Sequence, residues 1–100
     1  MYSIAYTVEA PVEAYNVLHP AVIGVTDSSG EGLLVHVARP TEAGFEIIEV
    51  WESKEHLDRF LRDTLPKALA ALPDMGGAAP HPTEFDLLGF LVYATEPIVI

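Results

Sequence analysis

Three stretches of this sequence are apolar at odd and even positions alike, and this pattern restricts the folds that the chain can adopt. Residues 33–38 (LLVHVA), 45–51 (FEIIEVW) and 87–94 (LLGFLVYA) have the length and the branched or aromatic composition of strands. A sheet with one solvated face alternates apolar and polar residues, and these strands do not. We therefore expect both faces of the sheet to be covered.

The remaining segments predict the order of the elements. Residues 2–9 alternate with the period of a strand, and residues 11–26 space their apolar side chains at helical intervals. Ser53 is expected to cap a second helix, which Pro66 should bend or restart. Residues 27–32 are expected to form a loop, 73–82 a surface linker, 83–95 the last strand and 96–100 a tail.

This order of strand, helix, strand, strand, helix, strand predicts an α+β fold. The simplest arrangement is a ferredoxin-like βαββαβ sandwich, a four-stranded antiparallel sheet with two helices on one face. The chain of 100 residues has the size of a single domain, residues 1–100. The uncovered face would expose more apolar surface than a monomer usually tolerates. We expect a homodimer that packs sheet to sheet into an α+β barrel.

Charge and composition narrow the classes of partner. The formal net charge is -10, with 15 acidic and 5 basic residues, which argues against nucleic acid and anionic membranes. A neutral or cationic small molecule, or a second copy of the chain, suits this charge better. No basic residue precedes Arg39 and the N-terminus alternates, so we expect no secretory signal and a cytoplasmic location. Cysteine is absent, which excludes disulfides and thiol nucleophiles.

Glu49 is the residue in these strands that most needs explanation. It has the same strand parity as Phe45, Ile47 and Trp51. In the dimer described above we expect this side to face the cavity between the two sheets, where a carboxylate could act as a base or orient a ligand. The alternative is that Glu49 accepts a hydrogen bond from a neighbouring donor across the sheet or the dimer interface, or points out at a wet edge.

His36 lies between valines in the preceding strand, where an imidazole needs a partner. It shares a face with Glu49 if opposed residue numbers sum to an odd value, and the sequence leaves that register open. If they share a face, they form a candidate acid–base pair. Trp51 and Tyr6 could stack on a planar ligand, although large aromatic residues often belong to the core.

Other chemistry finds little support in the sequence. His19, His56 and His81 are too scattered to suggest a metal site, and no metal or cofactor is expected. There is no glycine-rich phosphate loop and no G-x-S-x-G nucleophile turn.

Residues 32–69, GLLVHVARPTEAGFEIIEVWESKEHLDRFLRDTLPKAL, carry a resemblance. The strand with a histidine, the strand that ends in VWES and the helix with F…LP resemble small proteins of the dimeric α+β barrel superfamily, which includes antibiotic biosynthesis monooxygenases and uncharacterised relatives. The resemblance implies the same dimer, and a pocket between each sheet, its helices and the partner. In some members it implies cofactor-free oxygenation of an aromatic substrate, or haem degradation.

One departure from that pattern limits what the resemblance implies. Many relatives have a histidine near the end of the second helix, where this chain has residues 64–67, TLPK. A haem ligand at that position is therefore not carried over.

Two functional hypotheses follow. The first is a cofactor-independent, monooxygenase-like enzyme for a small aromatic or planar molecule, with Glu49 or His36 handling a proton. Its pocket would be shaped by Trp51, Tyr6, Ile47 and Phe45. The second is a non-catalytic homodimeric module that binds a small molecule or serves in assembly. A closed cavity lined by Glu49 or His36 would favour the enzyme.

Overall fold

The computed structural model describes residues 1–26, 32–70 and 80–93. Its elements, in chain order, are β1 (Tyr2–Val8), α1 (Val12–Thr26), β2 (Leu33–Pro40), β3 (Phe45–Trp51), α2 (Lys54–Arg59), the π-helix η1 (Phe60–Thr64), α3 (Leu65–Ala70) and β4 (His81–Phe85). In this part of the chain, no helix is long and apolar enough to cross a membrane.

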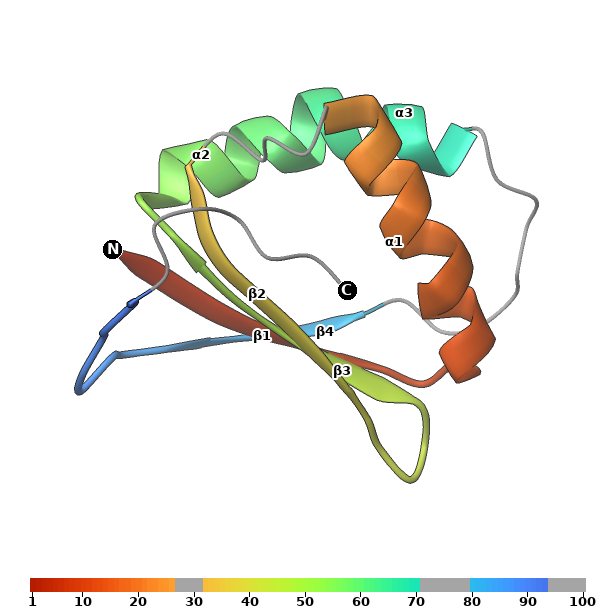
Figure 1. The fold of residues 1–100 in the computed structure, drawn as a ribbon, viewed down its shortest axis with the longest axis horizontal. Helices are drawn as coiled ribbons and strands as arrows, with labels where there is room; N and C mark the ends of the chain where they lie inside the picture. The colour runs from red at the N-terminus through yellow and green to blue at the C-terminus, as the bar shows by residue number, and fades with distance from the viewer. Residues whose placement is uncertain (27–31, 71–79, 94–100) are drawn as a thin grey trace.

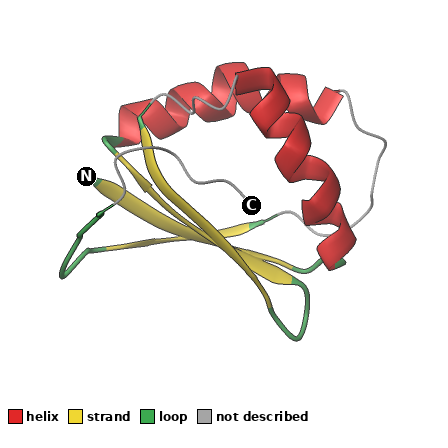
Figure 2. Ribbon diagram, in the orientation of Figure 1, coloured by secondary structure: helices red, strands yellow, loops and turns green. Residues whose placement is uncertain are grey.

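The strands form one antiparallel sheet in the order β2-β3-β1-β4, with β1 and β3 in the centre. Helix α1 and the α2–η1–α3 segment lie on the same side of this sheet (Figures 1 and 2). This is the ferredoxin-like sandwich that the sequence predicts.

The core lies between the sheet and the helices. Its first cluster joins Ile4, Trp51 and Leu57, and partly buried Phe60 packs against it. The second joins Val8, Ala10 and Phe45, with Tyr15 of α1 packed against it. Trp51, at 0% exposure, is the largest side chain that is fully buried among the described residues.

These contacts correct one prediction. We expected the side of β3 that carries Glu49 to face the cavity between two sheets. That side, which also carries Phe45, Ile47 and Trp51, instead faces the chain's own helices. Trp51 lies 5.4 Å from Phe60 and Phe45 lies 5.6 Å from Tyr15, centroid to centroid. Because β3 is apolar at both parities, alternation did not identify its helix-facing side. The bulkiest side chains occupy the side where helices can bury them.

The opposite side of the sheet presents a second apolar surface, which we call the outer face. Register and alternation place Val35, Val37, Ile48 and Phe85 on it. Val37 is 50% exposed and Phe85 38%. The described part of the chain therefore leaves this face incompletely covered, as the strand composition predicts.

The second helical segment begins and changes course as the sequence indicates. The Ser53 hydroxyl accepts a hydrogen bond from the His56 N–H at 3.3 Å, so Ser53 is the N-cap of α2. Pro66 has no N–H, and its ring would clash with the carbonyl four residues earlier in a regular helix. The chain widens into η1, where the Leu65 N–H bonds to the Phe60 carbonyl, and a new α-helix begins at Leu65.

The last strand is shorter than predicted, and this part of the prediction is wrong. Strand β4 ends at Phe85, and residues 86–93 have no regular structure. Phe85 pairs with Ser3, close to the start of β1 at Tyr2. Strand β1 therefore offers no partner to residues beyond this point, and Leu88, Leu91 and Tyr93 are 107%, 72% and 88% exposed.

The predicted connections lie partly outside the described residues. This applies to residues 27–31 of the predicted loop, 73–79 of the predicted linker, 94–95 of the predicted last strand and the tail at 96–100. His81 and Pro82, assigned to the linker from composition, instead begin β4. Proline is compatible with that position because β4 is an edge strand.

Candidate functional site

The β2–β3 register places His36 directly opposite Glu49. Their numbers sum to an odd value, the case in which the two side chains share a face. His36 Nδ1 lies 2.8 Å from Glu49 Oε2. The structure therefore answers the register question that the sequence left open, and it brings the two candidate residues together.

Glu49 also accepts a hydrogen bond from its own strand. The Trp51 Nε1–H donates to Glu49 Oε1 at 3.1 Å. Glu49 is only 8% exposed, so each of its oxygens is held by a specific donor. The carboxylate is thus paired across the sheet, which was one of the sequence alternatives. That pairing leaves its chemical role open, because buried pairs and active sites use the same contacts.

Two further residues of α1 extend this pair, and the sequence analysis did not select them. Tyr15 Oη lies 2.8 Å from His36 Nε2 and 3.2 Å from His19 Nδ1. The three ring planes lie within 19° of one another, with centroids 5.1 to 6.0 Å apart. We call Trp51, Glu49, His36, Tyr15 and His19 the polar chain.

A signal for Tyr15 and His19 was present in the sequence. They are four residues apart in a predicted helix, so they share one face of it. Tyr15 belongs to the apolar stripe that a helix turns toward a sheet. A tyrosine in such a stripe indicates packing, and His19 was considered only as a metal ligand, so the polar contact between helix and sheet was not predicted.

Proton positions along the polar chain follow from the chemistry of its groups. An ionised carboxylate only accepts, so His36 donates to Glu49 through Nδ1–H. The neutral imidazole then has an acceptor at Nε2, to which the Tyr15 hydroxyl donates. The Tyr15 oxygen can in turn accept from His19 Nδ1–H. Every donor in this arrangement points toward Glu49.

The phenols of the site remain protonated at neutral pH. Burial, followed by the negative charge of Glu49, raises the pKa of Tyr15. Burial, Glu49 and Asp58, in that order, raise the pKa of Tyr6 to about 12. Both hydroxyls are therefore hydrogen-bond donors and not phenolates.

Tyr6 differs from Tyr15 in its bonding. Its hydroxyl is buried and has no hydrogen-bond partner within the described residues. A buried polar group without a partner costs about 1–3 kcal/mol. Tyr6 lies on the helix-facing side of β1, opposite Ile47 of β3. Among the described residues of this region, the Tyr6 hydroxyl is the donor for which a ligand could supply the missing acceptor.

The other predicted pocket residues are more enclosed. Trp51 and Phe45 are 0% and 4% exposed, and Ile47 is half-buried. Trp51 contributes its indole N–H to Glu49, while its ring packs in the core. Direct contact of these three residues with a ligand remains a prediction. In the His36–Glu49 pair, His36 is the more exposed residue, with 23% of its side chain accessible against 10% for Glu49.

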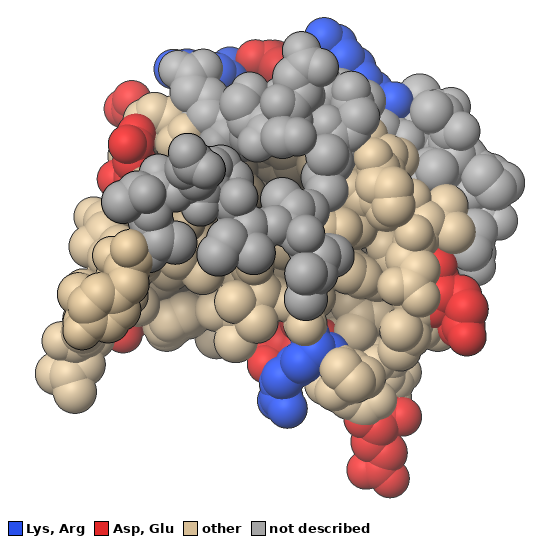
Figure 3. Space-filling view, viewed as in Figure 1, with Lys and Arg blue, Asp and Glu red and all other residues tan. Residues whose placement is uncertain are grey.

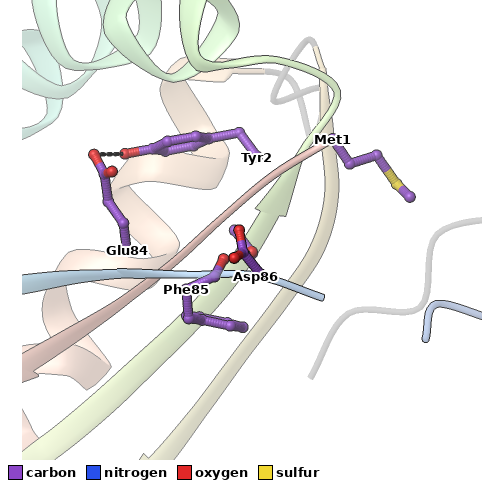
Figure 4. A pocket seen from close by; sticks show the side chains of 6 residues that line it. Met1, Tyr2, Glu84, Phe85 and Asp86 are labelled. Atoms are coloured by element: carbon purple, nitrogen blue, oxygen red, sulfur yellow. Dashed lines mark hydrogen bonds between the residues drawn. The ribbon is translucent and has the colours of Figure 1, made fainter. Parts of the chain in front are cut away.

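A separate hollow lies at one end of the sheet, where β1 begins and β4 ends. It has a volume of about 330 Å³ and is lined by Met1, Tyr2, Ser3, Glu84, Phe85 and Asp86 (Figure 4). The Tyr2 hydroxyl donates to Glu84 Oε1 at 2.5 Å across it. The hollow is open and contains neither Glu49 nor His36, so it is not the predicted pocket.

The remaining histidines have separate surroundings. His56 Nδ1 lies 2.7 Å from the Ser53 hydroxyl at the start of α2, and His81 is exposed on β4. Across residues 1–26, 32–70 and 80–93, no group of three or more His, Asp or Glu side chains is placed to hold a metal ion.

Neither a protein-family model nor a curated protein matches this sequence. Solved structures do match its fold. A candidate antibiotic biosynthesis monooxygenase from Deinococcus radiodurans aligns with a TM-score of 0.61 and 17% identity, over 96% of this chain and 100% of that one. A candidate of the same name from Caulobacter crescentus aligns with a TM-score of 0.65 and 16% identity, over 88% and 90%.

The haem degrader MhuD from Mycobacterium tuberculosis, solved with two haems in its active site, aligns with a TM-score of 0.62 and 16% identity, over 91% of this chain and 99% of that one. Identities this low establish a common fold and no common activity. The chain has the ferredoxin-like fold of antibiotic biosynthesis monooxygenase-like proteins, which the sequence resemblance predicted.

The unpartnered Tyr6 hydroxyl generates a stability prediction. We expect Tyr6→Phe to raise the free energy of unfolding by about 1 kcal/mol at neutral pH, because it removes a buried group that makes no hydrogen bond. The folded-state pKa of Tyr6, about 12, exceeds its ordinary value of 10.0. The unfolded chain therefore loses this proton first, and the free energy of unfolding, unaffected by this titration below pH 10, falls as pH rises from 10 to 12. Tyr6→Phe removes that fall, so it should also reduce destabilisation at alkaline pH.

Denaturant unfolding at neutral and alkaline pH measures both effects. Tyr2→Phe is the matched control, because that hydroxyl donates to Glu84 and its removal should give no gain at neutral pH. A loss of stability in Tyr6→Phe would contradict the assignment of an unsatisfied hydroxyl.

Proposed function

We propose that the chain binds a small, planar aromatic molecule beside the polar chain and removes a proton from it, as a cofactor-independent, monooxygenase-like enzyme. The observation that carries this proposal is the hydrogen-bonded series Glu49–His36–Tyr15, with contacts of 2.8 Å on both sides of the imidazole. A base oriented by a buried carboxylate and joined to a hydroxyl is the arrangement that general acid–base catalysis uses.

Each residue has a distinct part in this mechanism. Glu49 holds His36 in the tautomer with its proton on Nδ1, which keeps Nε2 free to accept. The Tyr15 oxygen takes the proton of the substrate as its own proton passes to His36 Nε2. Glu49 stabilises the imidazolium that forms. The deprotonated carbon gives one electron to dioxygen, and the two radicals combine to form a C–O bond. The peroxide takes back the proton held by His36 and loses water to leave a carbonyl, so dioxygen is the oxidant and no redox cofactor is required.

The structural relatives support the fold's suitability for this chemistry. Two carry the name of candidate antibiotic biosynthesis monooxygenases, and MhuD binds and degrades haem. The haem reaction is the less suitable precedent for this chain. Thr64, Leu65, Pro66 and Lys67 provide no imidazole near the end of the second helical segment.

The polar chain generates the test of activity. Dioxygen consumption is measured with a panel of anthrones and hydroquinones, whose protons are acidic enough for a histidine-linked base. We expect turnover by the unaltered protein, and a fall in kcat of about 100-fold or more in His36→Asn and in Tyr15→Phe, the size of a lost general base.

His81→Asn is the control, because it removes an exposed histidine of β4 and should leave kcat unchanged. Circular dichroism establishes that each variant is folded. Equal rates in the unaltered protein and both site variants would sink the catalytic proposal, as would the absence of turnover across the panel. Ligand binding without turnover would favour the alternative, a binding module.

A homodimer through the outer face is the second part of the proposal. Val37 and Phe85 are exposed on the two edge strands of that face, and exposed apolar residues follow Phe85 in segment 86–93. Exposed apolar surface of this extent is typical of an interface. Residues 86–93 also have no partner strand among the described residues, and the edge of a second sheet would supply one. A cytoplasmic location, and the absence of nucleic-acid and membrane partners, remain predictions from composition.

Val37→Lys tests the dimer without disturbing the core. Val37 is 50% exposed, so we expect the variant to stay folded but to be monomeric by sedimentation at micromolar concentration. An unpaired charge in an apolar interface costs several kcal/mol. Leu61→Lys, at a 41% exposed position on η1, is the control and should leave the mass unchanged. A monomeric unaltered protein would overturn this part of the proposal.

A further inference from the structure

The positive charges of this chain lie away from the polar chain. The sequence contains five lysines and arginines, and all five fall within the described residues. They are Arg39, Lys54, Arg59, Arg62 and Lys67. Every one is an exposed residue. In Figure 3 the blue side chains lie along the helical rim of the molecule and beside the β2–β3 hairpin.

Local contacts account for two of these charges. Register and alternation put Arg39 on the outer face, where its Nε donates to Glu46 at 2.9 Å. Arg62 donates to Asp63 through Nε at 3.0 Å and through Nη2 at 3.2 Å. Lys54 and Lys67, with Arg59, lie on the same helical segment as Arg62. This segment covers the side of the sheet that carries His36 and Glu49 (Figure 1), but its lysines and arginines are all exposed, so their charges lie toward solvent.

The charge that does lie at the site is negative. Glu49 is nearly buried, at 8% exposure, so solvent screens its carboxylate poorly. Tyr6 and Tyr15 both experience this charge, which raises the pKa of each, and Asp58 acts on Tyr6 in the same direction. Among the described residues, the donor left for a ligand here is the neutral hydroxyl of Tyr6.

We infer that the site selects its ligand by charge, accepting neutral or cationic planar aromatic molecules and rejecting those that carry a carboxylate. This rests on the proposed function, since it specifies the substrate class of the same site. A carboxylate placed beside Glu49 would meet like-charge repulsion at low dielectric, and no guanidinium or ammonium group lies there to offset it. A planar dicarboxylate such as protoporphyrin IX would meet this repulsion at two groups.

A matched series of naphthalenes tests this inference. We would measure binding of 2-naphthol, 2-naphthoate and 2-(aminomethyl)naphthalene at neutral pH by calorimetry. They have the same ring and are neutral, anionic and cationic. The single Trp51 indole N–H resonance would report binding at the site, because that group donates to Glu49. We expect naphthoate to bind about tenfold or more weakly than naphthol, and the cation to bind at least as tightly as naphthol.

Glu49→Gln should reduce the preference for naphthol over naphthoate to about threefold or less, because it removes the charge and keeps a hydrogen-bonding group. Glu46→Gln, at an outward position of the same strand, should leave the preference unchanged.

Naphthoate binding as tightly as naphthol would overturn the inference while leaving the aromatic site standing. A preference that Glu49→Gln does not alter would also overturn it. No binding by any of the three would instead refute the proposed function, and this inference with it.

Discussion

The buried carboxylate of Glu49 is the constraint on which the rest of this site depends. It lies between two apolar layers and accepts hydrogen bonds from Trp51 and His36. A carboxylate so enclosed must have donors on its oxygens, because an unpaired one would cost several kcal/mol. That requirement directs the indole N–H of Trp51 toward Glu49 and places the proton of His36 on Nδ1. The other ring nitrogen, Nε2, then remains for Tyr15. The pairing across β2 and β3 also opposes slippage of their register, since a shift by one residue would place His36 on the other face.

The sequence was sufficient for the architecture and insufficient for the direction in which the sheet faces. Alternation in residues 2–9, the Ser53 cap and the break at Pro66 all appear in the structure where local chemistry requires them. Strand β3 was assigned to the wrong layer because Ile48 and Val50 are as apolar as Ile47 and Trp51. The helix-facing side is decided by contacts with Tyr15 and Phe60, which come from distant parts of the chain. The length of β4 was misjudged for a related reason, because apolar residues continue past Phe85 where the partner strand does not.

The sequence identified two residues of the site but not the hydrogen bonds that join them to each other and to helix α1. Glu49 and His36 were identifiable as polar residues in apolar strands, but whether they met depended on a register that the sequence left open. Tyr15 and His19 were not identified, because contact between helix α1 and the sheet is a property of tertiary packing. The hydroxyl of Tyr6 indicates that stability is not the sole factor shaping this region. A phenylalanine would avoid a buried donor without a partner, and such local costs recur where proteins bind ligands.

The tautomer of His36 tests the central claim most directly. Nitrogen-15 NMR of histidine-labelled protein at neutral to mildly alkaline pH distinguishes a protonated ring nitrogen from an accepting one. The hydrogen-bond network predicts a proton on Nδ1, slowed in its exchange by Glu49, and an unprotonated Nε2 whose shift changes in Tyr15→Phe. A proton on Nε2, or an imidazole that exchanges freely and does not respond to Tyr15→Phe, would contradict the account.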